Sequence, residues 1–292
     1  MLTRRTFTIG TLATSALLKA ADGRIGFPTA ARERLAVSTY PFRDVIGPAK
    51  MSLPEFAATI PGKLKVHGIE PWSPHFKSND PEYVRGLASS FERSGLRVVN
   101  IPVDAKVQLC GSAEDREAGL AIYRKWVDAA VVLKSPGIRI HMPHAKQGDE
   151  IECAVNAFGP LVAYGASKNV VINIENDEPK TEQPERIVSV LKRFDSPFLR
   201  SLPDFCNSML INDSATYNDS AMQMLFPLAF NISHVKDSES DDGKTYRVNV
   251  DRIFAIAKNA NYRGYFSMEW EGGGDPYEGT RKLLEASLRN LS

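Results

Sequence analysis

The segments that decide the fold are Val170-Val-Ile-Asn-Ile-Glu175, Leu199-Arg-Ser-Leu-Pro-Asp204, Ala229-Phe-Asn-Ile-Ser-His234 and Tyr265-Phe-Ser-Met-Glu269. Each is a short, mainly apolar run that ends on a metal-ligating side chain, and these end residues are 29, 30 and 35 positions apart. That spacing is about one strand plus one helix, so we expect parallel strands whose carboxyl ends share one edge of a sheet. Three carboxylates and an imidazole at that edge predict a site for one hard divalent cation.

Four earlier apolar runs, residues 35–40, 68–72, 97–103 and 137–141, bring the expected strands to eight. Helix start signals lie between several of the strands, at Asp80-Pro81, Ser112, Gln183-Pro184 and Asp275-Pro276. We therefore predict an α/β fold, a single (β/α)8 TIM barrel over residues 35–292. An open doubly wound sheet is the alternative, weakened because no Gly-x-Gly-x-x-Gly follows the first strand.

Composition and charge exclude some classes of function. The chain has 292 residues and a formal net charge of +1, with no run of Lys or Arg, so we expect no nucleic-acid partner. Its three cysteines, Cys110, Cys153 and Cys206, are far apart and odd in number. They show no paired metal-binding spacing, so we predict free buried thiols rather than a disulfide or a zinc site.

The first 21 residues have the pattern of an export signal. Arg4-Arg5 precede a short apolar stretch that ends in small residues, which is typical of a twin-arginine signal peptide. The stretch is too short and too rich in Thr, Ser and Gly for a stable membrane span. We predict a signal peptide over residues 1–21, a linker over 22–34, and a periplasmic or secreted protein that uses the twin-arginine machinery.

Local motifs resemble a known family. They are Ile174-Glu175-Asn176, Pro203-Asp204-x-x-Asn207, His234-Val-Lys236-Asp237 and Met268-Glu269-Trp-Glu-Gly-Gly-Gly-Asp-Pro276. These resemble the xylose isomerase-like TIM barrel superfamily, and more narrowly its sugar phosphate isomerase/epimerase branch. The resemblance implies one divalent ion, with manganese first and cobalt, magnesium or zinc as alternatives. It also implies the ligands, which are Glu175, Asp204, His234 and Glu269.

The resemblance further implies that Glu175 and Glu269 are the catalytic pair. One would remove a proton from the carbon beside a sugar carbonyl, and the other would return it. The ion would stabilise the enediolate between these steps as a Lewis acid.

Substrate-binding residues are expected around this pair. Lys236 lies two residues after His234 and shares its side of the strand, and His141 lies near the end of the fourth strand. Glu70 ends the second strand, where it would bind substrate or orient a ligand. Asn207 stands where many sugar epimerases of this superfamily carry a histidine. Arg247 is the available counterpart of an arginine that these enzymes carry after the seventh strand.

The leading interpretation is an exported metal-dependent carbohydrate isomerase or epimerase. The alternative is a lyase or dehydratase that acts on keto-sugars or keto-glycosides through the same site. A non-catalytic sugar-binding barrel is a third hypothesis, against which the two opposed glutamates argue. A free or oxidised sugar fits export better than a phosphorylated one, and the sequence leaves the oligomeric state open.

Overall fold

The computed structural model describes residues 26–145 and 149–292. The predicted signal peptide therefore lies outside the described residues. Residues 26–34, the described part of the predicted linker, lie against the barrel: Phe27 packs edge-on against Phe230 and Tyr265. Arg34 donates hydrogen bonds to the carbonyl of Gly264.

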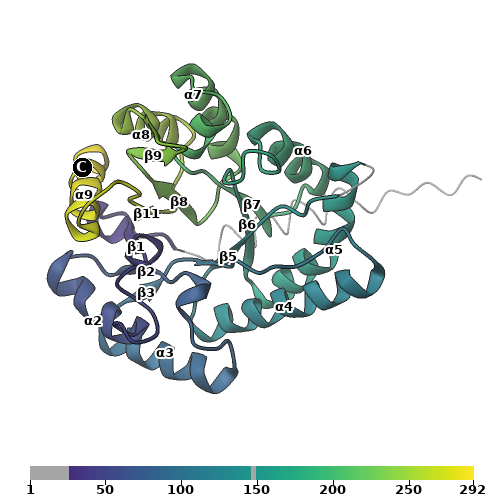
Figure 1. Cartoon of the computed structure of the whole chain (residues 1–292), viewed down its shortest axis with the longest axis horizontal. Coiled ribbons are helices and arrows are strands. Elements are labelled where there is room, and N and C mark those ends of the chain that lie inside the picture. Colours follow the sequence, from purple (N-terminus) through teal and green to yellow (C-terminus); the bar gives the residue numbers. More distant parts are fainter. Residues whose placement is uncertain (1–25, 146–148) are drawn as a thin grey trace, which may run out of the picture.

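Strands and helices alternate around a central barrel, with the helices outside (Figure 1). The barrel strands are β1 (Leu35–Ser38), β2 (Gly68–Glu70), β3 (Arg97–Val98), β4 (Ile101–Pro102), β5 (Gly137–Ile140), β6 (Val171–Glu175), β7 (Leu199–Leu202), β8 (Ile232–Val235) and β11 (Tyr265–Met268). The helices are α2 (Leu53–Lys63), α3 (Pro81–Arg93), α4 (Ala113–Val132), α5 (Glu150–Lys168), α6 (Pro184–Phe194), α7 (Ala215–Leu225), α8 (Val250–Asn259) and α9 (Pro276–Leu291).

All barrel strands are parallel and form two sheets, in the orders β3-β2-β1-β11-β8 and β4-β5-β6-β7. The sheets meet at two seams. β3 and β4 are two parts of the third barrel strand, interrupted at residues 99–100. Isolated parallel bridges, Ser201 with Ala229 and Asp204 with His234, join β7 to β8. The predicted single (β/α)8 barrel is confirmed.

Short-range sequence signals explain several helices. Ser112 and Asp115 form a reciprocal capping box that starts α4. Pro81 and Pro184 occupy the first positions of α3 and α6, where a missing N–H costs nothing. Apolar side chains of the strands and of the inner helix faces fill one continuous core. Among the described residues, no helix is both long enough and apolar enough to cross a bilayer.

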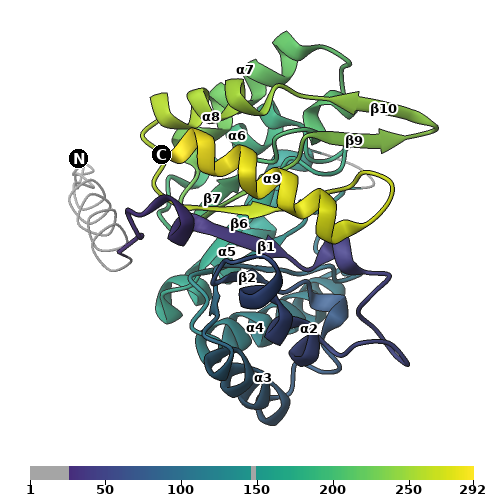
Figure 2. The same ribbon diagram turned by 90° about the vertical axis from the view of Figure 1, so that its left-hand side faces the viewer.

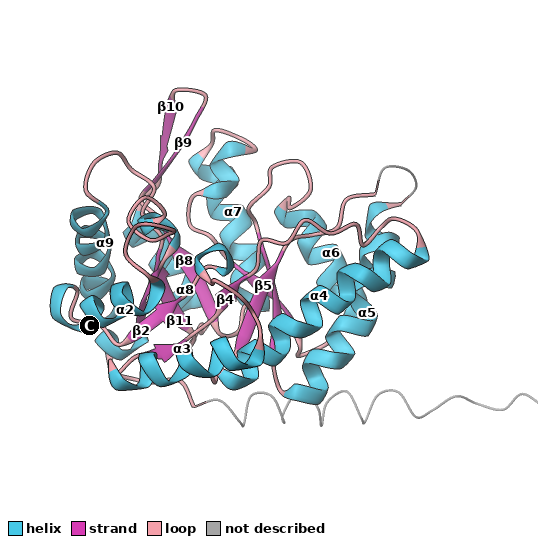
Figure 3. Cartoon of the chain, turned by 60° about the horizontal axis from the view of Figure 1, so that its bottom comes forward, coloured by secondary structure: helices cyan, strands magenta, loops and turns pink. Residues whose placement is uncertain are grey.

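An antiparallel hairpin of β9 (Ser238–Asp241) and β10 (Lys244–Arg247) interrupts the repeat after β8. It projects from the end of the molecule at which the barrel strands finish (Figures 2 and 3). Its turn, Asp242-Gly243, has positive φ at both residues (46° and 77°), the backbone that a tight hairpin turn requires. The turn explains why these largely polar strands pair.

The prediction of three free cysteines is wrong for two of them. Cys110 and Cys153 form a disulfide, with their Cα atoms 5.9 Å apart, whereas Cys206 is free and buried. Cys110 precedes α4 and Cys153 lies in the first turn of α5. These neighbouring helices start at the same end of the barrel, so a separation of 43 residues along the chain becomes a contact in space.

Candidate metal and active site

The four predicted metal ligands converge. Glu175 ends β6, Asp204 follows β7 by two residues, His234 lies on β8 and Glu269 directly follows β11. Because the strands are parallel, all four side chains arrive at the same end of the barrel. They are buried, and one ligand atom from each lies within 4.8 Å of the others.

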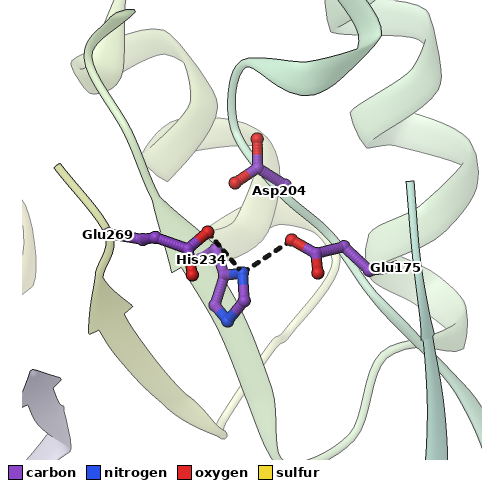
Figure 4. A group of neighbouring side chains, drawn as sticks. All are labelled: Glu175, Asp204, His234 and Glu269. Carbon is purple, nitrogen blue, oxygen red and sulfur yellow. Dashed lines mark hydrogen bonds and ion pairs between the residues drawn. The ribbon is translucent and has the colours of Figure 1, made fainter. Parts of the chain in front are cut away.

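Glu175 and Glu269 approach His234 from opposite sides, with Asp204 above them (Figure 4). His234 Nδ1 lies 2.6 Å from Glu175 Oε1 and 3.0 Å from Glu269 Oε2. The imidazole nitrogen thus faces both glutamates, as it would if all three bound one ion.

The donor set fits a divalent cation. Asp204 Oδ1 accepts the backbone N–H groups of Cys206 and Asn207, each at 2.8 Å. Its second oxygen, Oδ2, is buried and has no hydrogen-bond donor among the described residues. Burial raises the pKa of Asp204 to about 8, and the neighbouring carboxylates Glu175 and Glu269 add to the rise. An ion would satisfy this oxygen and offset the crowded negative charge.

Burial and nearby carboxylates also shift the pKa values of His234 and Glu175. Burial alone would lower the pKa of His234, but Glu175, Glu269 and Glu70 raise it well above its usual range. Burial raises the pKa of Glu175, against the opposing pull of His234 and Arg139. The carboxylates therefore favour a positive charge at His234 Nδ1, which is also the ring nitrogen that would face a bound ion.

Glu70 lies behind His234. It is completely buried, and its carboxylate oxygens are 3.0 and 3.1 Å from His234 Nε2. It also accepts a hydrogen bond of 2.9 Å from Asn100 Nδ2. A carboxylate that holds the second nitrogen of a ligating imidazole fixes its ring and tautomer. Of the two expected roles for Glu70, this geometry supports orientation of a ligand rather than contact with substrate.

Lys236 and Asn207 both lie at the site. Lys236 Nζ donates to Asn207 Oδ1 at 3.0 Å, and it lies 3.4 Å from Glu269 Oε2. Two further carboxylates contact it, Glu239 of the hairpin at 3.0 Å and Glu271 at 2.8 Å. Burial opposes its charge, but the surrounding acids keep its pKa well above the usual value.

His141 is half-exposed at the mouth of the barrel. Its Nε2 is 2.7 Å from Arg139 Nη1 and 3.1 Å from Asp104 Oδ1, and its Nδ1 is 3.1 Å from Glu182 Oε1. Arg247, by contrast, is exposed on β10. The structure therefore places His141 against Arg139, which in turn contacts Glu175, and leaves Arg247 on the hairpin.

Five acidic residues that contact Arg139, His141 or Lys236 were not predicted from the sequence. They are Asp104, Asp177, Glu182, Glu239 and Glu271. Glu271 carried a signal, because it follows Glu269 by two residues and so can lie on the same side of the chain. The other four occupy loops or the hairpin, where no periodic pattern marks an inward-facing acid.

Comparison with known proteins agrees with this architecture. A family model described as xylose isomerase-like TIM barrel matches residues 62–291. No curated protein matches the chain.

Solved structures resemble the chain in fold. A D-tagatose 3-epimerase-like protein has a TM-score of 0.70 at 14% identity, over 88% of this chain and 97% of that one. The 3-keto-D-glucoside 4-epimerase of E. coli gives 0.67 at 14%, over 88% and 98%. A xylose isomerase-like TIM barrel protein from Mycobacterium smegmatis, in complex with magnesium, gives 0.67 at 16%, over 91% and 98%. Since the family model covers most of the barrel, the chain belongs to the xylose isomerase-like TIM barrel family.

Proposed function

We propose that this protein is an exported, divalent-metal-dependent carbohydrate isomerase or epimerase. The observation that carries the proposal is the opposed placement of Glu175 and Glu269 on either side of His234 Nδ1, at 2.6 and 3.0 Å. Two carboxylates that face one reaction space from opposite sides can remove a proton from one face of a carbon and return it to the other. The epimerases among the similar folds support the same class of reaction.

Each residue has a role in this scheme. One glutamate accepts the proton from the carbon beside the carbonyl, and the other donates a proton to complete isomerisation or epimerisation. A divalent ion held by Glu175, Asp204, His234 and Glu269 would supply Lewis-acid stabilisation of negative charge on the sugar oxygens. Lys236, Asn207 and His141 lie where they can contact sugar hydroxyls.

The contacts of the two buried cations, Lys236 and Arg139, support an uncharged sugar as the substrate. Lys236 Nζ lies within 3.0 Å of Asn207, Glu239 and Glu271. Arg139 contacts Asp104 at 2.8 Å and Glu175 at 3.0 Å. Both cations are thus engaged by groups of the protein rather than free for a phosphate, which agrees with the preference for a free or oxidised sugar inferred from export.

Export has a second line of support besides the paired arginines at the N-terminus. The Cys110–Cys153 disulfide suits an oxidising compartment such as the periplasm. Replacing Arg4 and Arg5 with lysine should retain the protein in the cytoplasm, as measured by cell fractionation. Normal periplasmic delivery of this variant would refute the twin-arginine route.

The reaction can be tested by solvent exchange. Metal-loaded protein would be incubated in deuterated water with neutral keto-sugars, their phosphate esters and 3-keto-glycosides, and the products followed by NMR. We expect one carbon-bound deuterium in an intact neutral sugar. Release of an aglycone would instead indicate elimination, and the absence of exchange and product across the panel would reject both reactions.

Matched variants test the roles of the two glutamates. Glu175→Gln and Glu269→Gln should each lower kcat by at least about 10²- to 10⁴-fold, the usual contribution of a general acid or base, while sugar binding remains measurable. Glu33→Gln is the control, because Glu33 is distant from the four ligands and half-exposed, paired with Arg97. Native turnover in either site variant would contradict the proposed roles.

A further inference from the structure

A second group of potential metal ligands lies beside the first. His141, Asp177 and Glu182 each offer a ligand atom within 4.8 Å of the others. His141 Nδ1 is 3.1 Å from Glu182 Oε1 and 3.9 Å from Asp177 Oδ2. Glu182 is completely buried and is fixed by the backbone N–H of Met142 at 2.7 Å. One imidazole and two carboxylates form a donor set that suits a divalent cation.

A guanidinium, however, already lies among these donors. Arg139 projects from β5, and its side chain is only 7% exposed. Its Nη1 is 2.8 Å from Asp104 Oδ1 and its Nη2 is 3.8 Å from Asp177 Oδ2. The same Nη1 is 2.7 Å from His141 Nε2. Because arginine keeps its charge at any physiological pH, this position always holds a cation.

The same guanidinium also reaches the first site. Arg139 Nε is 3.0 Å from Glu175 Oε2, while Glu175 Oε1 is the oxygen that faces His234 Nδ1 at 2.6 Å. Arg139 therefore forms a close ion pair, without a hydrogen bond, with one oxygen of this glutamate, while the other oxygen is directed at the shared ligand position. A buried carboxylate with a fixed positive charge beside one oxygen is favoured in the orientation that keeps this contact.

We propose that Arg139 is a built-in cation that takes the place of a second metal ion and positions Glu175 for proton transfer. The first part concerns the number of ions and stands alone; the second rests on the proposed function. Without the guanidinium, the carboxyl groups of Asp104, Asp177 and Glu182 would surround His141 without this compensating cation. Unpaired charge in a buried site destabilises the fold, and a bound divalent ion would neutralise it.

The ion count tests the first part without any substrate. Metal-free native protein and Arg139→Gln would be titrated with Co²⁺, and bound metal measured by equilibrium dialysis and by the visible absorption of cobalt. We expect one ion in the native chain and two in Arg139→Gln. Adding His141→Ala to Arg139→Gln should return the count to one. Two ions in the native protein, or one in Arg139→Gln, would overturn the proposal.

A conservative variant separates charge from geometry. Arg139→Lys keeps a cation but lacks the planar fork that contacts several carboxylates together. It should bind one ion, whereas two would overturn the proposal. This variant also keeps the test decisive if Arg139→Gln does not fold.

Kinetics test the positioning role. Arg139→Lys should lower kcat about 10- to 100-fold, the usual cost of losing a group that orients a ligand, with KM changed less than threefold. Arg97→Gln is the matched control, a strand arginine paired with Glu33 away from the four ligands. Native kcat in Arg139→Lys would overturn the positioning role. If no sugar is turned over even by the native protein, the proposed function fails while the ion counts remain interpretable.

Discussion

The two halves of the barrel contribute to the site in different ways. Residues 170–292 supply the four side chains that converge, each at a strand end. Residues 35–169 supply groups that hold three of those four in place. These contacts are Ser38 Oγ to Glu269 at 3.2 Å, Glu70 to His234 at 3.0 Å and Arg139 to Glu175 at 3.0 Å. The second half thus carries the reacting groups, and the first half fixes their orientation.

Asp204 differs from the other three ligands. Its carboxylate is held by backbone N–H groups of its own loop, at Cys206 and Asn207, and lies 3.7 Å from Lys236 Nζ. A ligand held by adjacent backbone needs no partner from across the barrel. The three ligands with longer side chains are the ones that receive cross-barrel support.

The largest effect should come from the disulfide, which lies in the first half. Replacing Cys110 and Cys153 with serine should lower the free energy of unfolding by about 2–4 kcal/mol, because the bridge restricts the unfolded chain. Urea denaturation measures the loss. If the first half only supports the site, the four ligands should stay together, so metal affinity should change by no more than a few-fold.

Two controls make this result specific. Reductant should destabilise the native protein by a similar amount and should leave the double-serine variant unchanged. Cys206 is free and buried, so it should play no part in the response to reductant. A native protein whose unfolding midpoint does not respond to reductant would contradict the prediction.

The sequence could not reveal this disulfide for a physical reason. Cys110 and Cys153 are 43 residues apart, and only the packing of α4 against α5 brings them together. The strands were easier to predict, because an apolar run that ends in an acid, such as the one before Glu175, marks both a buried strand and its carboxyl end. The hairpin was missed because its strands are largely polar, although Asp242-Gly243 is a recognised turn signal.

Within the site, too, residues at strand ends were easier to predict than the residues that contact them. Glu175, Asp204, His234 and Glu269 could be predicted because each closes a strand, so a one-dimensional pattern fixes where each lies. The partners of Arg139 that were not predicted, Asp104 and Asp177, lie in the loops after β4 and β6, where no periodic pattern marks them. Glu70 was placed at a strand end, but its contact with His234 crosses the barrel interior and depends on side-chain packing.

A smaller effect should follow from loosening one cross-barrel contact. Glu70→Gln removes the negative charge behind His234 Nε2 and keeps the side-chain shape. Metal affinity should fall about 10- to 100-fold, as is usual when a group that orients a metal-ligating histidine is lost. Competitive titration with a chelating dye measures the change, and Glu33→Gln provides a carboxyl-to-amide control away from the site. Unchanged affinity would mean that the second half orients its own histidine.

The smallest effect concerns two buried histidines that differ in their surroundings. His234, in the second half, faces three carboxylates, which raise its pKa despite burial. His75, in the first half, contacts Thr39 Oγ1 at 2.9 Å and packs edge-on against Trp72. Burial without a carboxylate partner lowers the pKa of His75 to about 4.

The sign of its effect on stability follows from this shift. As the pH falls below about 6.5, the unfolded chain takes up a proton at His75 before the folded protein does, so folding stability is lost between about pH 6.5 and 4. His75→Gln cannot titrate but can still hydrogen-bond to Thr39. Metal-free His75→Gln should therefore lose less stability than the metal-free native protein between pH 7.5 and 5.5, as measured by urea midpoints. Equal losses in the two proteins would show that His75 is not held neutral by burial, and the contrast between the two histidines would fail.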